Sequence, residues 1–214
     1  MNEDFLLNGP VRNLSRIFRF SSMPMHEPEN VAEHTFWVGW YSMQIVHWYT
    51  NKPPTGFGET LKYPLVNVKI LYELTFCHDL AECYTGDMIR PVKYSSEKFL
   101  EAYREMEEEG LNDLLAQLPT DTSLAVQRAL EFKAENPESI EVRILKLADL
   151  LSVWGKLKEE ANLGNRYAQE ELNNSLDAYA EQFYDDPDLG PLFAEIASEL
   201  RLVPQRLNRW PRGR

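Results

Sequence analysis

Phe76-Cys77-His78-Asp79-Leu80-Ala81-Glu82 is the stretch of this 214-residue chain that decides its fold and its chemistry. Apolar residues around it recur at steps of three and four, which predicts a buried helical face from Pro64 to about Cys83. The adjacent His78 and Asp79 are then expected on neighbouring positions of that helix. An imidazole and a carboxylate placed in this way can both reach one divalent metal ion.

The same helical periodicity extends over most of the chain, and no alternation typical of a β-strand appears over a useful length. We expect further helices at about 30–48, 95–118, 123–133, 138–161, 167–184 and 189–200. Thr85-Gly86-Asp87 and Arg90-Pro91 should form loops, because glycine and proline interrupt helices. The sequence therefore predicts an all-α helical bundle that forms a single domain over residues 1–214.

Composition narrows the class of protein. The net charge of -12 argues against binding to nucleic acid polymers or anionic membranes, because both need a basic surface. The two cysteines, Cys77 and Cys83, lie six residues apart on the predicted helix, where a disulfide would be geometrically awkward. We recognise no signal peptide and no run of apolar residues long enough to span a membrane. We therefore expect a cytoplasmic protein whose partner is a small molecule.

Four side chains share a problem that one metal ion would solve. His34 lies on the apolar face of its predicted helix, and Asp149 lies in the apolar run 147–151. A carboxylate buried among apolar residues costs on the order of several kcal/mol unless it is paired or bound to a cation. One divalent cation would satisfy His34, His78, Asp79 and Asp149 together. Two imidazoles and two carboxylates suit cobalt, manganese, zinc, iron or nickel, and suit magnesium less well.

Each of these residues also has an ordinary interpretation. Alone, His34 would be a core histidine bonded to the backbone, and Asp149 would pair with Lys146 or Arg143. The order His, then His-Asp, then Asp, each on its own helix, favours the metal site instead. Four protein ligands would leave two positions of a six-coordinate ion open for water and substrate. Such an ion polarises a phosphoryl oxygen, which indicates phosphoester hydrolysis.

This order of ligands on an all-α chain resembles the HD-domain metal-dependent phosphohydrolase superfamily. Within it, three segments are similar to motifs of the bacterial 5′-deoxynucleotidase family and together span about residues 19–150. They are Arg19-Phe20 with Glu29-Asn30-Val31-Ala32-Glu33-His34, then 78–87 with Pro91-Val92-Lys93-Tyr94, and finally Lys146-Leu147-Ala148-Asp149. The resemblance implies that His34, His78, Asp79 and Asp149 hold the metal, and it suggests a homodimer.

The resemblance also implies roles for residues around the metal. Glu82 would orient or deprotonate the attacking water, Asp87 would assist catalysis near the scissile bond or sugar, and Arg19 would bind the phosphate. Glu82 follows His78 by one helical turn and is therefore expected to project to the same side. A planar guanidinium suits a phosphate better than an ammonium group does. Phe20 stands where the family has tryptophan, and we expect it to contact the sugar or base.

Lys93 is a further candidate for substrate binding, since it could neutralise additional phosphate charge. Its alternative interpretation is a solvated surface lysine.

The preferred function is a divalent-metal-dependent phosphohydrolase that removes the 5′-phosphate of deoxyribonucleoside monophosphates. A second hypothesis is a deoxynucleoside triphosphate triphosphohydrolase that releases triphosphate. A third is a non-catalytic nucleotide sensor, and retention of every ligand and of Glu82 counts against it.

Overall fold

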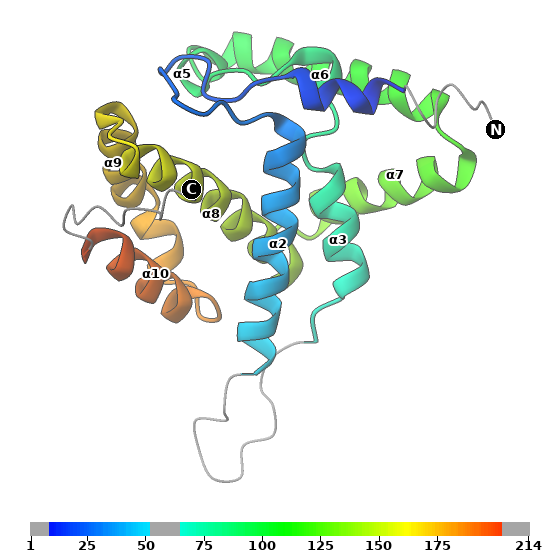
Figure 1. Ribbon diagram of the computed structural model, residues 1–214. Coiled ribbons are helices and arrows are strands. Elements are labelled where there is room, and N and C mark those ends of the chain that lie inside the picture. Colours follow the sequence, from blue (N-terminus) through cyan, green and yellow to red (C-terminus); the bar gives the residue numbers. More distant parts are fainter. Residues whose placement is uncertain (1–8, 52–64, 203–214) are drawn as a thin grey trace, which may run out of the picture. The chain divides into compact units, whose positions relative to one another are not determined.

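The computed structural model describes residues 9–51 and 65–202, and its regular structure is helical (Figure 1). This agrees with the predicted all-α class. Over the described residues there is no β-strand, and one isolated β-bridge joins Phe18 to Asn30. No helix in these ranges is both long enough and apolar enough to cross a membrane. The elements are η1 (Pro10–Arg16), α2 (Val31–Thr50), α3 (Val68–Cys77), α4 (Glu82–Thr85), α5 (Arg90–Lys93), α6 (Glu97–Gln117), α7 (Thr120–Glu135), α8 (Ile140–Asn162), α9 (Arg166–Tyr184) and α10 (Gly190–Leu202).

The chain divides into two compact units. The first contains residues 1–22 and 28–152, and the second contains residues 23–27 and 153–214. Helix α8 begins in the first unit and ends in the second. Every predicted site residue belongs to the first unit, so the site can be described within that unit alone.

Helices α2 and α3 lie side by side in the first unit (Figure 1). The buried stripe of α2 follows the predicted helical period and includes His34, which has no exposed surface. In the second half of the helix Ile45 is buried as predicted, but at two other positions the buried residue lies one place later than predicted. Ser42 and Tyr49 are fully buried there, whereas Tyr41 and Trp48 are only partly buried. A period of 3.6 residues produces this displacement over five turns.

The predicted helix through His78 and Asp79 ends earlier than the sequence suggested. Helix α3 stops at Cys77, His78 is its C-cap, and residues 78–81 form a turn. In this turn the amide N–H groups of Leu80 and Glu82 donate to the carbonyls of Cys77 and Asp79, three residues earlier. This tighter bonding pattern replaces the α-helical one. The predicted start at Pro64 lies outside the described residues.

The apolar side chains of this turn pack into a small buried cluster. Cys77, Leu80 and Cys83 are each only 7% exposed, and they pack with Leu14, Val31 and residues of α6 and α7. Both cysteines are free thiols, as their spacing along the chain predicts. Because the apolar side chains of the turn point into this cluster, the intervening polar side chains of His78, Asp79 and Glu82 are held on the other side.

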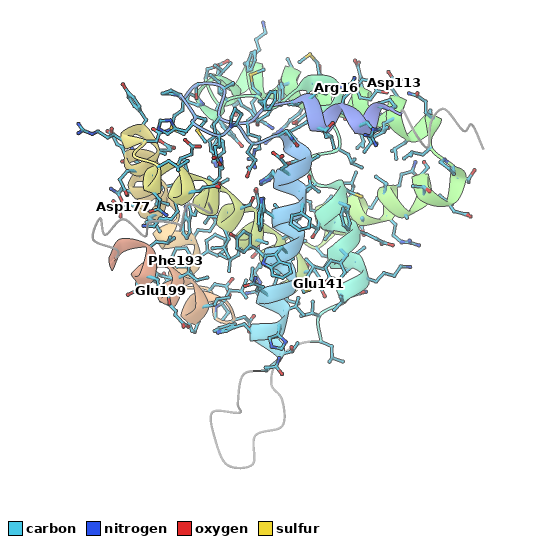
Figure 2. All side chains as sticks on the ribbon, in the orientation of Figure 1. Arg16, Asp113, Glu141, Asp177, Phe193 and Glu199 are labelled. Carbon is cyan, nitrogen blue, oxygen red and sulfur yellow. The ribbon has the colours of Figure 1, made fainter. Side chains whose placement is uncertain are left out.

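The second unit has an aromatic core of its own. Phe193 of α10 is labelled in Figure 2. Its ring centroid lies 4.9 Å from that of Tyr184, 5.4 Å from that of Phe183 and 5.6 Å from that of Trp154. Residues 23–27 join this unit through Glu160 of α8, which is fully buried.

Candidate metal and phosphate site

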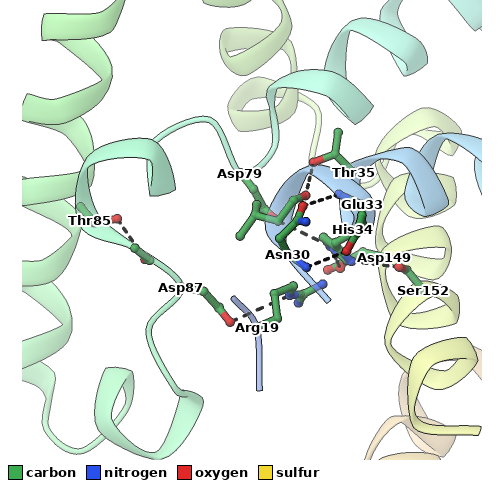
Figure 3. Close-up of polar contacts among 12 residues, drawn as sticks. Arg19, Asn30, Glu33, His34, Thr35, Asp79, Thr85, Asp87, Asp149 and Ser152 are labelled. Atoms are coloured by element: carbon green, nitrogen blue, oxygen red, sulfur yellow. Dashed lines mark hydrogen bonds and ion pairs between the residues drawn. The ribbon is translucent and has the colours of Figure 1, made fainter. Parts of the chain in front are cut away.

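Three of the four predicted metal ligands, His34, His78 and Asp79, lie close together. Figure 3 shows two of them, His34 and Asp79. His34 Nε2 lies 3.4 Å from His78 Nε2 and 3.5 Å from Asp79 Oδ2. His78 Nε2 is 3.1 Å from the same Asp79 oxygen. One ligand atom from each residue lies within 4.8 Å of the others, a spacing that one metal ion could bridge. The turn at 78–81 achieves this convergence even though it is not helical.

Asp149 approaches the same group from α8. Its Oδ1 lies 3.1 Å from His34 Nε2, while 46% of its side-chain surface is exposed. The sequence had suggested a carboxylate buried in an apolar run. Instead, Ala148 and Leu150 face the core, and Asp149 lies at the accessible edge of the site. Its partner is His34, and Lys146 donates to the Pro137 carbonyl.

Two further residues orient the imidazole rings. His78 Nδ1 lies 2.7 Å from the carbonyl oxygen of Thr75, so this nitrogen carries a proton and donates it. The lone pair of His78 Nε2 is then free to bind a metal, which is the usual arrangement behind a histidine ligand. His34 Nδ1 lies 2.9 Å from Ser152 Oγ. Sequence reasoning missed Thr75 and Ser152, although each lies three residues along the chain from a predicted ligand.

The ionisation of these groups suits a cation. Burial lowers the pKa of His34, so its ring is neutral and available as a ligand. Burial alone would raise the pKa of Asp79, but the charge and hydrogen bond of His78 outweigh it and hold the pKa below its ordinary value. Imidazole nitrogens and ionised carboxylates form the donor set that borderline divalent metals prefer, and His34 is already in its neutral form. The residues therefore fit the predicted metal.

Glu82 lies in a different environment from the ligands. Burial, followed by the negative charges of Asp79 and Asp87, raises the pKa of Glu82 to about 9. Its Oε2 is buried and has no hydrogen-bond partner among the residues that the structure describes. In the metal-free protein this carboxyl group therefore holds its proton at neutral pH. The positive charge of a divalent cation bound nearby would favour the ionised form that a general base needs.

Arg19 faces Asp87 across the site. Arg19 Nε lies 4.0 Å from Asp87 Oδ2, and both side chains are mostly buried (Figure 3). Arg19 Nη1 is buried and makes no hydrogen bond within residues 9–51 and 65–202. A buried guanidinium donor that lacks a partner indicates a place for an anionic ligand.

The backbone around Arg19 explains how it is held. The Arg19 N–H donates to the Glu29 carbonyl at 2.9 Å, and the Val31 N–H donates to the Ile17 carbonyl at 3.0 Å. These bonds attach the segment to the start of α2. The next residue, Phe20, has a φ of 58°, a left-handed conformation that is costly for a bulky side chain. Its ring centre lies 5.7 Å from the guanidinium carbon of Arg19.

Lys93 has a specific partner that the sequence did not suggest. Its Nζ lies 3.0 Å from Glu107 Oε1 of α6 and 4.6 Å from the centre of the Tyr103 ring. Burial alone would lower the pKa of Lys93, but the hydrogen bond and charge of Glu107 raise it. Lys93 is therefore a half-buried, charged lysine that is paired with the Glu107 carboxylate, and it is not a solvated surface lysine.

Comparisons of sequence identify relatives of known kind. The family described as 5′-deoxynucleotidase YfbR-like matches residues 8–186. A 5′-deoxynucleotidase of Pasteurella multocida is 31% identical over 155 residues, which cover 72% of this chain and 73% of the relative. A 5′-deoxynucleotidase of Vibrio cholerae is 29% identical over 160 residues, covering 74% of this chain and 77% of the relative.

Solved structures share the fold. An HD-domain phosphohydrolase of Listeria innocua superposes with a TM-score of 0.70 at 21% identity, covering 92% of this chain and 88% of that one. An HD phosphohydrolase of cyanophage S-2L, solved with dA and one catalytic zinc ion, gives a TM-score of 0.59 at 18% identity. That alignment covers 90% of this chain and 96% of the phage protein.

Proposed function

This chain belongs to the 5′-deoxynucleotidase YfbR-like family, and from that membership we propose that it hydrolyses the 5′-phosphate of deoxyribonucleoside monophosphates. It is an HD-domain phosphohydrolase in fold and in family. The observation that carries the proposal is the convergence of His34, His78 and Asp79 beside an arginine that lacks a full set of partners. The products would be a deoxynucleoside and inorganic phosphate.

We assign the metal to His34, His78, Asp79 and Asp149. The distances among their ligand atoms and the neutral state of His34 support this assignment. A divalent cation held there would polarise a phosphoryl oxygen and make a water molecule more acidic. Cobalt, manganese, zinc, iron and nickel all suit the donor set. The zinc of the cyanophage protein is one precedent in this fold.

The remaining residues would divide the work of a phosphoryl transfer to water. Arg19 would bind the phosphate oxygens through its free donor, which orients the phosphorus for in-line attack. Glu82 would accept a proton from the attacking water as the new P–O bond forms. The 5′ oxygen would leave as the old P–O bond breaks and would take up a proton from solvent. Asp87 would fix Arg19 and the substrate, and Phe20 would contact the sugar or base.

Glu82 can be tested without disturbing the metal ligands. Glu82→Ala should retain the metal, because its side chain is not among the assigned ligands, yet lose most turnover of dAMP. Metal content measured by mass spectrometry and phosphate release separate the two effects. Wild-type turnover in this variant would remove Glu82 from the mechanism.

The charges of the site favour a monophosphate over a triphosphate. Each of the two candidate phosphate-binding cations already faces a carboxylate: Arg19 faces Asp87, and Lys93 faces Glu107. A triphosphate would bring additional negative charge to a site that is also lined by Asp79 and Asp149. We therefore expect inorganic phosphate from dAMP and no inorganic triphosphate from dATP. Phosphorus NMR of the two reaction mixtures distinguishes the alternatives, and triphosphate release from dATP would favour the second one.

We also propose a homodimer in the cytoplasm. Large aromatic side chains on the outer faces of α2 and α3 support self-association: Phe36 and Phe76 are each 61% exposed, and Trp40 is 44% exposed. The free, buried thiols are compatible with a reducing compartment. Analytical ultracentrifugation should give twice the chain mass of 24.9 kDa, and a species at the chain mass would exclude the dimer.

A further inference from the structure

Tyr103 of α6 contacts the loop that carries Asp87, although nothing in the proposed mechanism uses it. Its side chain is almost completely buried, with 1% of its surface exposed. Its hydroxyl oxygen lies 3.2 Å from the Gly86 carbonyl oxygen and 3.3 Å from Thr85 Oγ1. A single phenolic proton is therefore shared between two acceptors at the end of α4.

The backbone of Gly86 links the first residue of α4, Glu82, to Asp87. Its N–H donates to the Glu82 carbonyl at 2.8 Å, and its carbonyl accepts from Tyr103. Gly86 has a φ of 74° and a ψ of 168°, a conformation that turns the chain sharply away from α4. The next residue is Asp87, which lies 4.0 Å from Arg19. The orientation of Asp87 thus depends on a peptide that Tyr103 helps to hold.

The tyrosine itself is well fixed. Its ring stacks on Phe99 at 15° between planes, and Lys93 Nζ lies 4.6 Å from its centre on a face of the ring. Burial raises the pKa of the Tyr103 phenol, so the hydroxyl keeps its proton and donates at neutral pH. Thr85 Oγ1 acts as an acceptor here, because its own proton points to the backbone carbonyl of Ala81 or Gly86.

We infer that Tyr103 is a positioning residue, whose hydroxyl holds the Gly86 carbonyl and thereby directs Asp87 toward Arg19 and the phosphate. The role of Asp87 in turnover rests on the proposed function. The hold of Tyr103 on the loop does not, and the two parts are tested by separate measurements.

The first measurement is hydrogen exchange of the metal-free, ligand-free protein. Tyr103→Phe keeps the ring and its contact with Lys93 but removes the hydroxyl. Peptides covering residues 82–93 should exchange faster in this variant, while peptides of α9 should be unchanged. Tyr167→Phe, at a tyrosine that is 65% exposed, is the matched control and should leave all peptides unchanged. Unaltered exchange at 82–93 in Tyr103→Phe would overturn the inference.

The second measurement is a double-mutant cycle on dAMP hydrolysis, followed at excess enzyme so that slow variants remain measurable. Tyr103→Phe should lower kcat/KM by about tenfold in the wild-type background, because a small misplacement of a substrate-orienting group is costly. In the Asp87→Asn background it should change kcat/KM by less than about twofold. An equal loss in both backgrounds would show a merely structural effect and would contradict positioning through Asp87.

The two measurements keep the proposals separate. If the wild-type protein does not hydrolyse dAMP, the proposed function fails, and the exchange of residues 82–93 still decides whether Tyr103 holds the loop. If the wild-type protein is active and the Asp87→Asn rate is no higher than background, the exchange result decides alone.

Discussion

The two ring nitrogens of His78 have separate partners. Nδ1 donates to the Thr75 carbonyl at 2.7 Å, and Nε2 lies 3.1 Å from Asp79. When no metal is bound, the nearby Asp79 carboxylate favours a proton on His78 Nε2. Burial alone would lower the pKa of His78, but Asp79 raises it. A metal must displace that proton, so binding should weaken as the pH falls.

Asp79→Asn tests the assigned ligands most directly at the residue scale. An amide oxygen is a poorer ligand than a carboxylate and brings no negative charge, so the variant should lose both bound metal and dAMP hydrolysis. Metal content after gel filtration is measured against wild type. The exposed Asp113 of α6 supplies the matched control, since Asp113→Asn should retain both properties (Figure 2). A metal-loaded, active Asp79→Asn protein would refute the site.

Glu82 should give the metal-free protein a characteristic pH dependence. Its pKa is raised to about 9 in the folded state, so the folded protein binds a proton that the unfolded chain has already released. The stability that this proton provides is fully present below the ordinary glutamate pKa and is lost as the pH rises toward 9.

The free energy of unfolding, from urea denaturation in chelator, should therefore fall between about pH 6 and about pH 8, with at most about 1.4 kcal/mol per pH unit from this group. Glu82→Gln, which is neutral at every pH, should show a smaller fall over the same range. Parallel curves for the two proteins would exclude a raised pKa at Glu82.

At the scale of elements, apolar periodicity was sufficient to predict the long helices. The predicted segments correspond to α2, α6, α7, α8, α9 and α10 within a few residues at each end. The periodicity failed at residues 78–81, because the apolar steps continue through a turn whose hydrogen bonds are three residues apart. A pattern of side chains alone cannot distinguish that turn from another helical turn, since both place Cys77, Leu80 and Cys83 on the buried side.

Gly86 is the residue on which the end of α4 depends. Its φ of 74° with a ψ of 168° lies in a region that residues with a Cβ rarely adopt, although no atom lies within 4 Å of an added Cβ. Gly86→Ala should therefore lower the free energy of unfolding by about 1–3 kcal/mol through backbone strain alone. It should also lower turnover, because Asp87 follows directly.

Gly39 of α2 provides the control for this substitution. A Cβ there would lie 3.5 Å from Thr75 Cγ2, an ordinary contact, and alanine favours a helix more than glycine does. Gly39→Ala should be neutral or stabilising in the same urea titration. Equal stability of Gly86→Ala and wild type would show that this backbone conformation is not required.

At the scale of the molecule, the assigned site lies in one of two compact units. The sequence was sufficient to predict His34, His78, Asp79 and Asp149 as metal ligands. It did not predict the contacts that hold the surrounding side chains in place. Lys93 meets Glu107 and Tyr103 only because α5 packs against α6, a contact that no local pattern encodes. The predicted single domain stays a prediction beside the observed division into two units.

Glu160 should stabilise the second unit. Its carboxylate accepts the N–H groups of His26 at 2.7 Å and Glu27 at 2.8 Å, together with Asn165 Nδ2 at 3.0 Å. Burial acts to raise the pKa of Glu160, but these hydrogen bonds and Lys156 lower it to about 2. The stability that it contributes is therefore present above the ordinary glutamate pKa and is lost as the pH falls toward 2.

Glu160→Gln should lower the melting temperature at neutral pH and reduce the loss of stability on acidification. Calorimetry at several pH values measures both effects. The exposed Glu170 of α9 supplies the matched control, and Glu170→Gln should behave like wild type. A Glu160→Gln protein with wild-type stability at neutral pH would show that this carboxylate does not hold residues 23–27.

The central claim is that the four-ligand site makes this chain a metal-dependent deoxyribonucleotide phosphohydrolase. Release of inorganic phosphate from dAMP tests it most directly, measured for chelator-treated protein before and after manganese or cobalt is restored. We predict negligible release from the treated protein, full recovery with metal in the wild type, and no recovery in Asp79→Asn. Phosphate release that persists without metal, or its absence with every metal supplied, would contradict the claim.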